Sequence, residues 1–206
     1  IGLAFFFEYL DNTIKAQEDV EMRLGVPVLG TVPLFESKDE NIEETILKEP
    51  QSIIAESYKT IRTAILLSSA SRPPRSILVT SMGPGEGKTS TSVNLAMTID
   101  RSGYSVLLID SDLRKPRIHS IFRLNNLSGL STYLAGATPD IDTVFKNPIT
   151  NLTVIPSGPL PPNPSELLGS NKMNGLLGIL NERFDLVIWD SPPLMSERKS
   201  VVYGKS

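Results

Sequence analysis

From residue 75 to residue 193, the chain alternates between short apolar runs and stretches whose apolar residues have helical spacing. Four runs, each bounded by turn residues, read SILVT (76–80), YSVLLIDSD (104–112), LTVIPSG (152–158) and FDLVIWDSPP (184–193). Such runs predict buried strands. The intervening segments predict helices at 88–102 and 172–183, short helices within 127–147, and a turn at 161–170. This alternation indicates an α/β fold with a doubly wound, mostly parallel sheet and helices on both faces.

The preceding segment predicts one clear amphipathic helix, at residues 53–69. Residues 71–74, with two prolines, end it. Further upstream, residues 11–24 predict a short helix, and the two prolines of VPVLGTVPLF (26–35) favour a linker or edge strand. The acidic residues 39–50 are typical of solvated surface. The apolar positions that predict the helix at 53–69 are Ile53, Ile54, Ile61, Ile65 and Leu66.

An apolar run, Ile1–Phe7, opens the sequence and has two interpretations. A membrane-spanning helix needs about 20 apolar residues, so this run is too short to cross a bilayer by itself. It fits the buried end of an ordinary helix. It also fits the last turns of a membrane helix, because charged residues follow it directly. Both interpretations stay open on the residues alone.

Composition excludes several classes of function. The 206 residues are 40% hydrophobic and 21% charged, which is typical of a globular protein. The formal net charge of -3 provides no overall attraction to nucleic acid, and we expect no nucleic-acid partner. With no cysteine and a single histidine, His119, thiolate or histidine metal clusters and a Ser-His triad are improbable.

The stretch SMGPGEGKTST (81–91) follows the first predicted strand and opens the next helix. Glycines there allow backbone N–H groups to wrap phosphates at a helix N-terminus. Lys88 would reach the phosphate oxygens and the Thr89 hydroxyl would ligate Mg²⁺. The usual P-loop has a glycine where this chain has Met82. The predicted nucleotide-binding residues are Gly83, Gly85, Glu86, Gly87, Lys88, Thr89 and Ser90.

Three carboxylates follow predicted strands. Asp110 and Asp112 lie at and just beyond the end of the second strand, and Asp190 ends the fourth. Ligands of parallel α/β sheets bind at the carboxyl ends of strands. Mg²⁺ prefers oxygen ligands and keeps several waters. The sequence therefore predicts a magnesium site formed by Thr89 with these aspartates.

The motifs SMGPGEGKT, LLIDSDLRKP and LVIWDSPP resemble the Walker A, Walker A′ and Walker B motifs of bacterial tyrosine kinases, a ParA/MinD-type branch of the P-loop NTPases. The stretch SGPLPPNPSELLGS (157–170) is also similar to the family. The resemblance covers residues 50–195 and implies an ATP- and Mg²⁺-dependent protein-tyrosine kinase that regulates capsule or exopolysaccharide export. It implies catalytic roles for Lys88, Asp110 and Asp112, and a metal-bound water held by Asp190. Which aspartate accepts the tyrosine proton stays open.

The resemblance also implies a partner. Family members assemble into a ring through a Glu-x-x-Arg-x-x-Arg element, and Glu56, Lys59 and Arg62 occupy its places here. Lys59 replaces the first arginine and keeps the charge without the planar fork. An ordinary exposed pair on one helix is the alternative.

The resemblance further implies an organisation in three parts. Residues 1–35 correspond to the end of a transmembrane activator and its junction, 36–74 to a linker with the oligomerisation helix, and 75–206 to the kinase domain. This places the chain at the cytoplasmic face of the bacterial inner membrane. After Pro193 the resemblance ends, which indicates a C-terminally truncated domain with an unpaired edge on the strand beside the fourth strand. The tail contains one tyrosine, Tyr203.

Two other functions fit the same motifs. A ParA/MinD-like ATPase would hydrolyse ATP and position cargo without phosphorylating proteins. An inert adaptor would bind nucleotide or a partner kinase and transfer nothing. The element at 56–62 and the apolar start of the chain favour the kinase, whose substrates would be protein tyrosines.

Overall fold

The computed structural model describes residues 17–34, 49–69, 72–149 and 151–195. The predictions for the apolar run at 1–7, the first residues of the helix at 11–24, most of the acidic stretch at 39–50 and the tail with Tyr203 lie outside these ranges. Within them, no helix is long and apolar enough to cross a bilayer.

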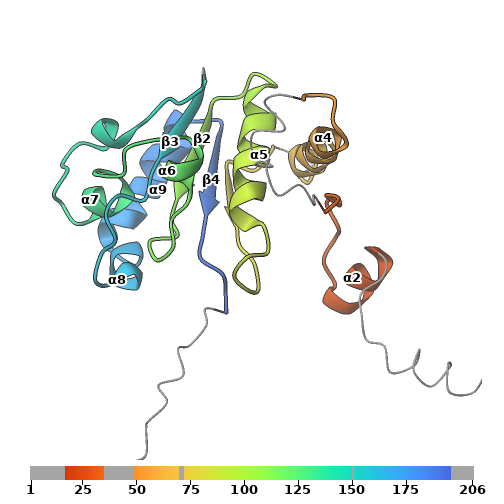
Figure 1. Cartoon of the computed structure of the whole chain (residues 1–206), viewed down its shortest axis with the longest axis horizontal. Coiled ribbons are helices and arrows are strands. Elements are labelled where there is room, and N and C mark those ends of the chain that lie inside the picture. Colours follow the sequence, from red (N-terminus) through yellow and green to blue (C-terminus); the bar gives the residue numbers. More distant parts are fainter. Residues whose placement is uncertain (1–16, 35–48, 70–71, 150, 196–206) are drawn as a thin grey trace, which may run out of the picture.

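A four-stranded parallel sheet forms the centre of the fold (Figure 1). The four predicted apolar runs each supply one strand: β1 (Ser76–Val79), β2 (Val106–Asp110), β3 (Leu152–Ile155) and β4 (Leu186–Asp190). The strand order is β1-β4-β2-β3, and every pair is parallel. The α/β prediction with a parallel sheet is therefore confirmed. In this order, β1 lies beside β4 at an edge of the sheet.

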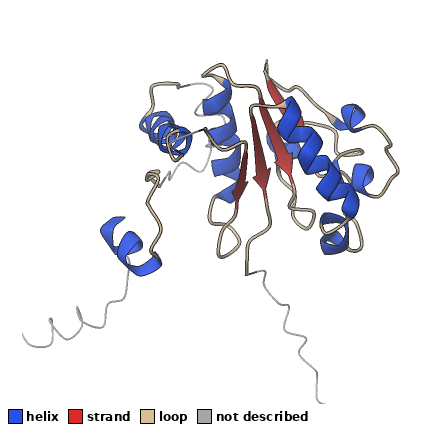
Figure 2. Ribbon diagram, turned by 180° about the vertical axis from the view of Figure 1, so that it is seen from behind, coloured by secondary structure: helices blue, strands red, loops and turns tan. Residues whose placement is uncertain are grey.

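Helices cover both faces of the sheet, as predicted (Figures 1 and 2). One face packs against α5 (Lys88–Asp100), and α4 (Ile53–Leu66) packs on the outside of α5. The other face packs against α7 (Leu130–Leu134), the 3₁₀ turn η1 (Ile141–Val144) and α9 (Asn171–Arg183). Successive side chains of β2 alternate between these two cores, Leu108 on the α5 side and Leu107 and Ile109 on the other.

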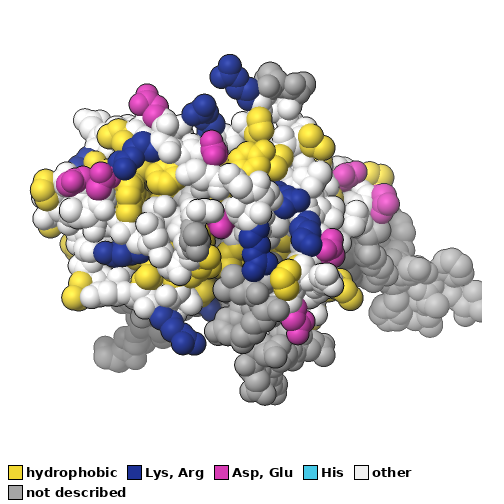
Figure 3. All heavy atoms as spheres, turned by 90° about the horizontal axis from the view of Figure 1, so that it is seen from above, with side chains coloured by type: hydrophobic (Ala, Val, Ile, Leu, Met, Phe, Trp, Pro, Cys, Tyr) yellow, Lys and Arg dark blue, Asp and Glu magenta, His cyan; other side chains and the backbone are white. Residues whose placement is uncertain are grey.

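All residues of β2 and β4 are buried, as expected for central strands covered on both faces. The carboxyl ends of all four strands lie at one edge of the sheet, where the glycine loop joins β1 to α5 (Figure 1). The opposite end of the molecule, at the amino ends of the strands, has a surface of interspersed basic, acidic and apolar side chains (Figure 3). This arrangement places the predicted chemical groups at one edge of the molecule.

Two predictions of local structure are wrong in detail. Ile53 was expected on the buried face of its helix but is 76% exposed. A turn of 100° per residue puts Ile54, Tyr58 and Ile65 on the buried side and leaves Ile53 outside. The predicted turn at 161–170 contains a short helix, α8 (Pro164–Leu168), because Pro164 at the first position is preset for helix formation.

The remaining elements are short. α6 (Ile118–Ile121) follows the second strand, and α2 (Gln17–Leu24) lies in the N-terminal segment. Residues 25–34 form no strand, which supports the linker interpretation of VPVLGTVPLF. Trp189, Tyr58 and Tyr133 are buried as packing residues.

Candidate active site

The glycine loop connects the edge strand β1 to helix α5. Gly85 and Gly87 both have φ of +81°, a backbone conformation that L side chains rarely adopt. Gly87 is the N-cap of α5. The first hydrogen bond of the helix runs from Thr91 N–H to the Gly87 carbonyl at 2.8 Å, so the earlier N–H groups point out of the helix end. This end is suited to binding an anion.

Thr89 and Asp190 form a buried pair across the end of the sheet. The Thr89 hydroxyl donates to Asp190 Oδ2 at 2.7 Å, and the Ser92 hydroxyl donates to Oδ1 at 3.1 Å. Burial raises the pKa of Asp190, while the bonds from Thr89 and Ser92 and the charge of Lys88 oppose the rise. Ser92 was not predicted from the sequence. It lies three residues after Thr89, and this spacing places both hydroxyls on the same face of α5.

Lys88 is held by Asp112 in a shielded ion pair. Lys88 Nζ lies 2.9 Å from Asp112 Oδ2, and the side chains are 12% and 4% exposed. Asp112 Oδ1 accepts the N–H groups of Arg114 at 3.3 Å and Lys115 at 3.0 Å. Both oxygens of Asp112 are therefore engaged, and the ammonium of Lys88 is held at the N-terminal end of α5.

Asp110 has a different environment. Oδ2 accepts the N–H groups of Arg117 at 3.1 Å and Ile118 at 3.0 Å. Oδ1 is buried and has no hydrogen-bond partner. Burial raises the pKa of Asp110 to about 7, with smaller contributions from the negative charges of Asp190 and Asp112, while the N–H bonds oppose the rise. The carboxyl group can therefore exchange a proton near neutral pH.

The three aspartates lie at or just beyond the carboxyl ends of neighbouring strands, as the sequence predicted. Asp110 and Asp190 are paired in register at the ends of neighbouring strands β2 and β4, and Asp112 follows two residues later. Their side chains have different partners, however. Among the described residues, no three acidic or histidine side chains are arranged to hold a metal ion together.

The donor set fits Mg²⁺ through few direct ligands. Thr89 supplies a hydroxyl oxygen, and Asp190 lies within hydrogen-bond distance of it. The unpartnered Oδ1 of Asp110 is an orphaned buried acceptor near the same strand ends. Mg²⁺ keeps several waters and takes few carboxylates, so aspartates that hold waters satisfy its chemistry. The residues present are therefore compatible with the ion.

The charged residues of α4 lie apart from this cluster. Lys59 Nζ pairs with Glu56 Oε1 at 2.6 Å within the helix, and both side chains are exposed. Arg62 turns toward α5, where its guanidinium donates to the Thr98 carbonyl at 3.3 Å and to the Ser102 hydroxyl. In this chain the three residues thus make contacts within the protomer, and their role in assembly stays a prediction.

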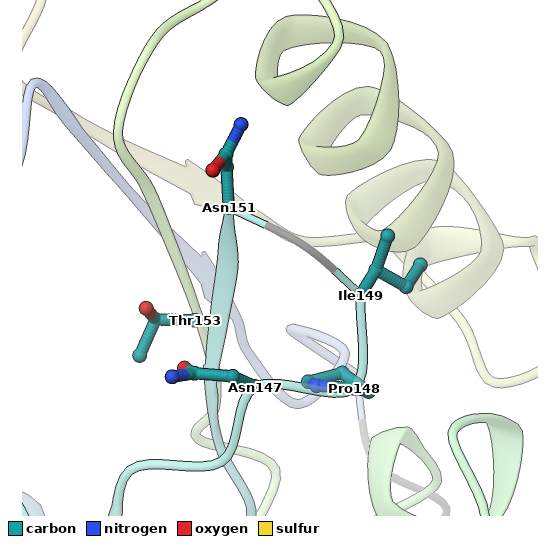
Figure 4. A pocket seen from close by; sticks show the side chains of 5 residues that line it. All are labelled: Asn147, Pro148, Ile149, Asn151 and Thr153. Carbon is teal, nitrogen blue, oxygen red and sulfur yellow. The ribbon is translucent and has the colours of Figure 1, made fainter.

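A separate hollow of about 730 Å³ lies at the amino end of edge strand β3. Asn147, Pro148, Ile149, Asn151 and Thr153 line it (Figure 4). It is open, has no titratable lining residue and lies at the opposite end of the strands from the glycine loop. None of the predicted site residues lines this hollow.

The parallel sheet, the glycine loop and the aspartates at the strand ends define a P-loop nucleotide-binding domain, and residues 74–201 match the family profile described as an AAA domain. Tyrosine-protein kinase YwqD of Bacillus subtilis is 41% identical over 158 residues, 77% of this chain and 67% of that protein. Tyrosine-protein kinase ptk of Acinetobacter johnsonii is 35% identical over 213 residues, 98% of this chain and 29% of that protein. The chain belongs to the family of bacterial tyrosine-protein kinases.

Solved structures agree with this assignment. The kinase domain of the Escherichia coli tyrosine kinase ETK has a TM-score of 0.81 at 32% identity, covering 90% of this chain and 76% of that chain. The septum site-determining protein MinD of Pyrococcus horikoshii has a TM-score of 0.51 at 22% identity, covering 59% and 50%, and shares the fold alone. The resemblance inferred from the three motifs is confirmed, and the MinD-like alternative is not favoured.

Proposed function

We propose that the chain is the catalytic domain of an ATP- and Mg²⁺-dependent protein-tyrosine kinase. The observation that carries the proposal is the arrangement at the carboxyl ends of the strands, where the shielded Lys88–Asp112 pair lies at the start of α5 and Asp110, whose pKa is raised to about 7, ends β2. Phosphoryl transfer depends mainly on positioning and on neutralising charge. The cluster offers a cation, oriented N–H groups and a proton acceptor for this reaction.

The loop and Lys88 bind the phosphates in this proposal. N–H groups at the start of α5 orient the chain of phosphates, and Lys88 exchanges its contact with Asp112 for the phosphate oxygens. Thr89 and Asp190 would hold Mg²⁺, which would supply positive charge to neutralise the transferred group. Gly83, Glu86 and Ser90 shape the remainder of the loop.

Asp110 is the base in this proposal. Its buried Oδ1 has no hydrogen-bond partner, and burial raises its pKa to about 7. Asp110 accepts the proton of a tyrosine hydroxyl while the phenolic oxygen forms a bond to the γ-phosphorus. The bond between that phosphorus and the oxygen bridging to the β-phosphate breaks, and ADP leaves. A base whose pKa lies near the working pH is efficient in such a transfer.

The biological setting is also part of the proposal. CapB of Staphylococcus aureus, a putative tyrosine-protein kinase, is 38% identical over 157 residues, and a Klebsiella pneumoniae relative is named for its cps region. We assign this chain to regulation of capsule or exopolysaccharide synthesis and export. Residues 1–35 would join it to a transmembrane activator of the same chain at the cytoplasmic face of the inner membrane.

Assembly through residues 36–74 completes the proposed organisation, with residues 75–206 as the kinase domain. Glu56, Lys59 and Arg62 would form charged contacts between copies in a ring. The exposed Glu56–Lys59 pair supports this proposal, because exposed charges can exchange partners at low cost. Bound copies would then supply tyrosines to one another.

Phosphotyrosine formation with ATP and Mg²⁺ tests the reaction. Purified chain is incubated with a tyrosine-containing acceptor peptide, and phosphotyrosine is measured by mass spectrometry. The proposal expects transfer by the chain and none by Asp110→Asn, which keeps the size of the side chain. ADP release without phosphotyrosine would instead indicate an ATPase, and nucleotide binding without turnover would indicate an adaptor.

A further inference from the structure

Glu86 lies inside the glycine loop, beside the region proposed to bind phosphates. A carboxylate repels a phosphate, so a direct contact between Glu86 and the nucleotide is unfavourable. The side chain folds back along the loop instead. Its Oε2 accepts the N–H of Met82 at 3.0 Å. Glu86 therefore contacts the entrance of the loop, at the position where the usual motif has a glycine.

Several hydrogen bonds hold that entrance, including one from Leu194 N–H to the Ser81 carbonyl at 2.9 Å. The Ser81 hydroxyl donates to the Gly83 carbonyl at 2.7 Å, and Met195 N–H donates to the Met82 carbonyl at 2.9 Å. Glu86 accepts from the remaining backbone group of Met82, its N–H. The Met82 side chain is 55% exposed and takes no part in these bonds. The loop thus fixes the backbone of Met82 without requiring a glycine there.

Gly83 makes room for the same contact. A Cβ added at Gly83 would lie 3.0 Å from Glu86 Oε1, so the carboxylate would have to move by a few tenths of an ångström. A side chain at position 83 would therefore press on the carboxylate that accepts the Met82 N–H. This coupling is specific to the orientation of Glu86.

We propose that Glu86 is a positioning residue that sets nucleotide affinity by bracing the loop entrance through Met82, a role that rests on the proposed function for the identity of the nucleotide. The carboxylate holds residues 82–86 in the shape that presents the later N–H groups to phosphate. It acts through the backbone and touches neither nucleotide nor acceptor. Loss of the brace raises KM for ATP and leaves kcat nearly unchanged.

The first test compares Glu86→Ala and Glu86→Gln in the full chain. Amide hydrogen exchange at Met82 is measured without nucleotide, and KM and kcat are measured with ATP. Loss of one hydrogen bond should speed exchange and raise KM by about 3- to 10-fold in Glu86→Ala. Glu86→Gln keeps an acceptor oxygen and should stay within about 2-fold of the parent. Glu182→Ala, on the exposed face of α9, removes the same charge at a distance.

The second test is a double-mutant cycle with Gly83→Ala. Alone, Gly83→Ala should raise the dissociation constant for ATP, because the new Cβ displaces the carboxylate. With Glu86→Ala the clash is absent, so the combined effect should be smaller than the product of the two single effects. Unchanged Met82 exchange in Glu86→Ala, or strictly multiplicative effects in the cycle, would overturn the proposal.

The two proposals fail separately. If the parent chain forms no phosphotyrosine but Glu86→Ala still accelerates Met82 exchange and weakens ATP binding, the brace stands and the kinase assignment falls. If the parent forms phosphotyrosine and Glu86→Ala matches Glu182→Ala in every measurement, the brace falls alone. Equal losses in Glu86→Gln and Glu86→Ala would also overturn the brace, because charge would then be the operative property.

Discussion

Two lysine–carboxylate pairs in this molecule have similar geometry and very different surroundings. Lys88 and Asp112 lie 2.9 Å apart with side chains 12% and 4% exposed. Lys59 and Glu56 lie 2.6 Å apart with side chains 40% and 60% exposed. Water screens the second pair, and exposed pairs contribute about 0–1 kcal/mol. The shielded pair leaves an uncompensated charge when one partner is removed, so burial decides which pair matters.

The largest expected effect comes from removing the shielded lysine. Lys88→Met takes a cation from the proposed phosphate site and should reduce phosphotyrosine formation about 100- to 1,000-fold. Lys59→Met is the matched control, since it removes the same side chain from the exposed pair. Lys59→Met should leave the rate constant for phosphotyrosine formation unchanged when it is expressed per assembled active site. Comparable losses in both variants would contradict the assignment of Lys88 to phosphate binding.

Asp110 gives a prediction on pH. Its pKa is raised from 3.8 to about 7 in the folded chain, so the native state binds more protons than the unfolded state between these values. Stability contributed by this group is therefore greatest below about pH 4 and falls as pH rises to about 7. Asp110→Asn should be more stable than the parent by about 4 kcal/mol at pH 8 and by less than about 1 kcal/mol at pH 4.

Urea unfolding at the two pH values, without nucleotide or metal, measures this difference. Asp142→Asn is a control, since Asp142 is an exposed acid on η1 that forms an ion pair with Arg183. A difference for Asp110→Asn that does not change with pH would contradict the raised pKa. The same variant should lose phosphotyrosine formation, which would show that this carboxylate reduces stability and serves function.

Removing the acid of each pair sharpens the comparison further. Asp112→Asn leaves Lys88 without its counter-charge and should lower the free energy of unfolding by about 2 kcal/mol at pH 7. Glu56→Gln should change it by less than about 0.5 kcal/mol. Denaturation of both variants at low and high salt measures the contrast. Equal destabilisation would show that burial is not the deciding factor.

A small effect on stability is also expected from Glu56→Lys, which is aimed at assembly. The folded protomer should lose less than about 0.5 kcal/mol. If α4 joins copies through complementary charges, the variant should have monomer mass in light scattering where the parent has a larger mass. Salt should weaken the parent's association in the same measurement. A mass that is the same for both proteins would exclude this interface.

Much of the fold was predictable because the strands are continuous apolar runs. β2 and β4 are buried on both faces, and their continuous apolar runs, LLI and LVIW, predict this burial without any tertiary information. The glycine loop was predictable because its backbone has positive φ at Gly85 and Gly87, a conformation that favours glycine. The order of strands was not, because the insertion of β4 between β1 and β2 depends on contacts far apart in the chain.

The site was predictable in its residues and less so in its pairings. Sequence placed Asp110, Asp112 and Asp190 at strand ends. The sequence alone could not predict that Asp112 forms an ion pair with Lys88, or that Asp110 accepts hydrogen bonds from two N–H groups at the start of α6. Those partners depend on how the chain turns after β2. Ile53 shows the same limit, since one residue of helical phase decides between core and solvent.

Helix α5 has a mechanical consequence through its contacts with α4. With 13 residues it is a rod of about 20 Å, with the phosphate-binding loop at one end. Near the other end, the Arg62 guanidinium donates to the Thr98 carbonyl and to the Ser102 hydroxyl. Near the loop, the Tyr58 hydroxyl donates to the Thr91 hydroxyl at 3.5 Å. Close-packed interiors transmit strain with little compression. We therefore expect a displacement of α4 to be transmitted along α5 to the glycine loop.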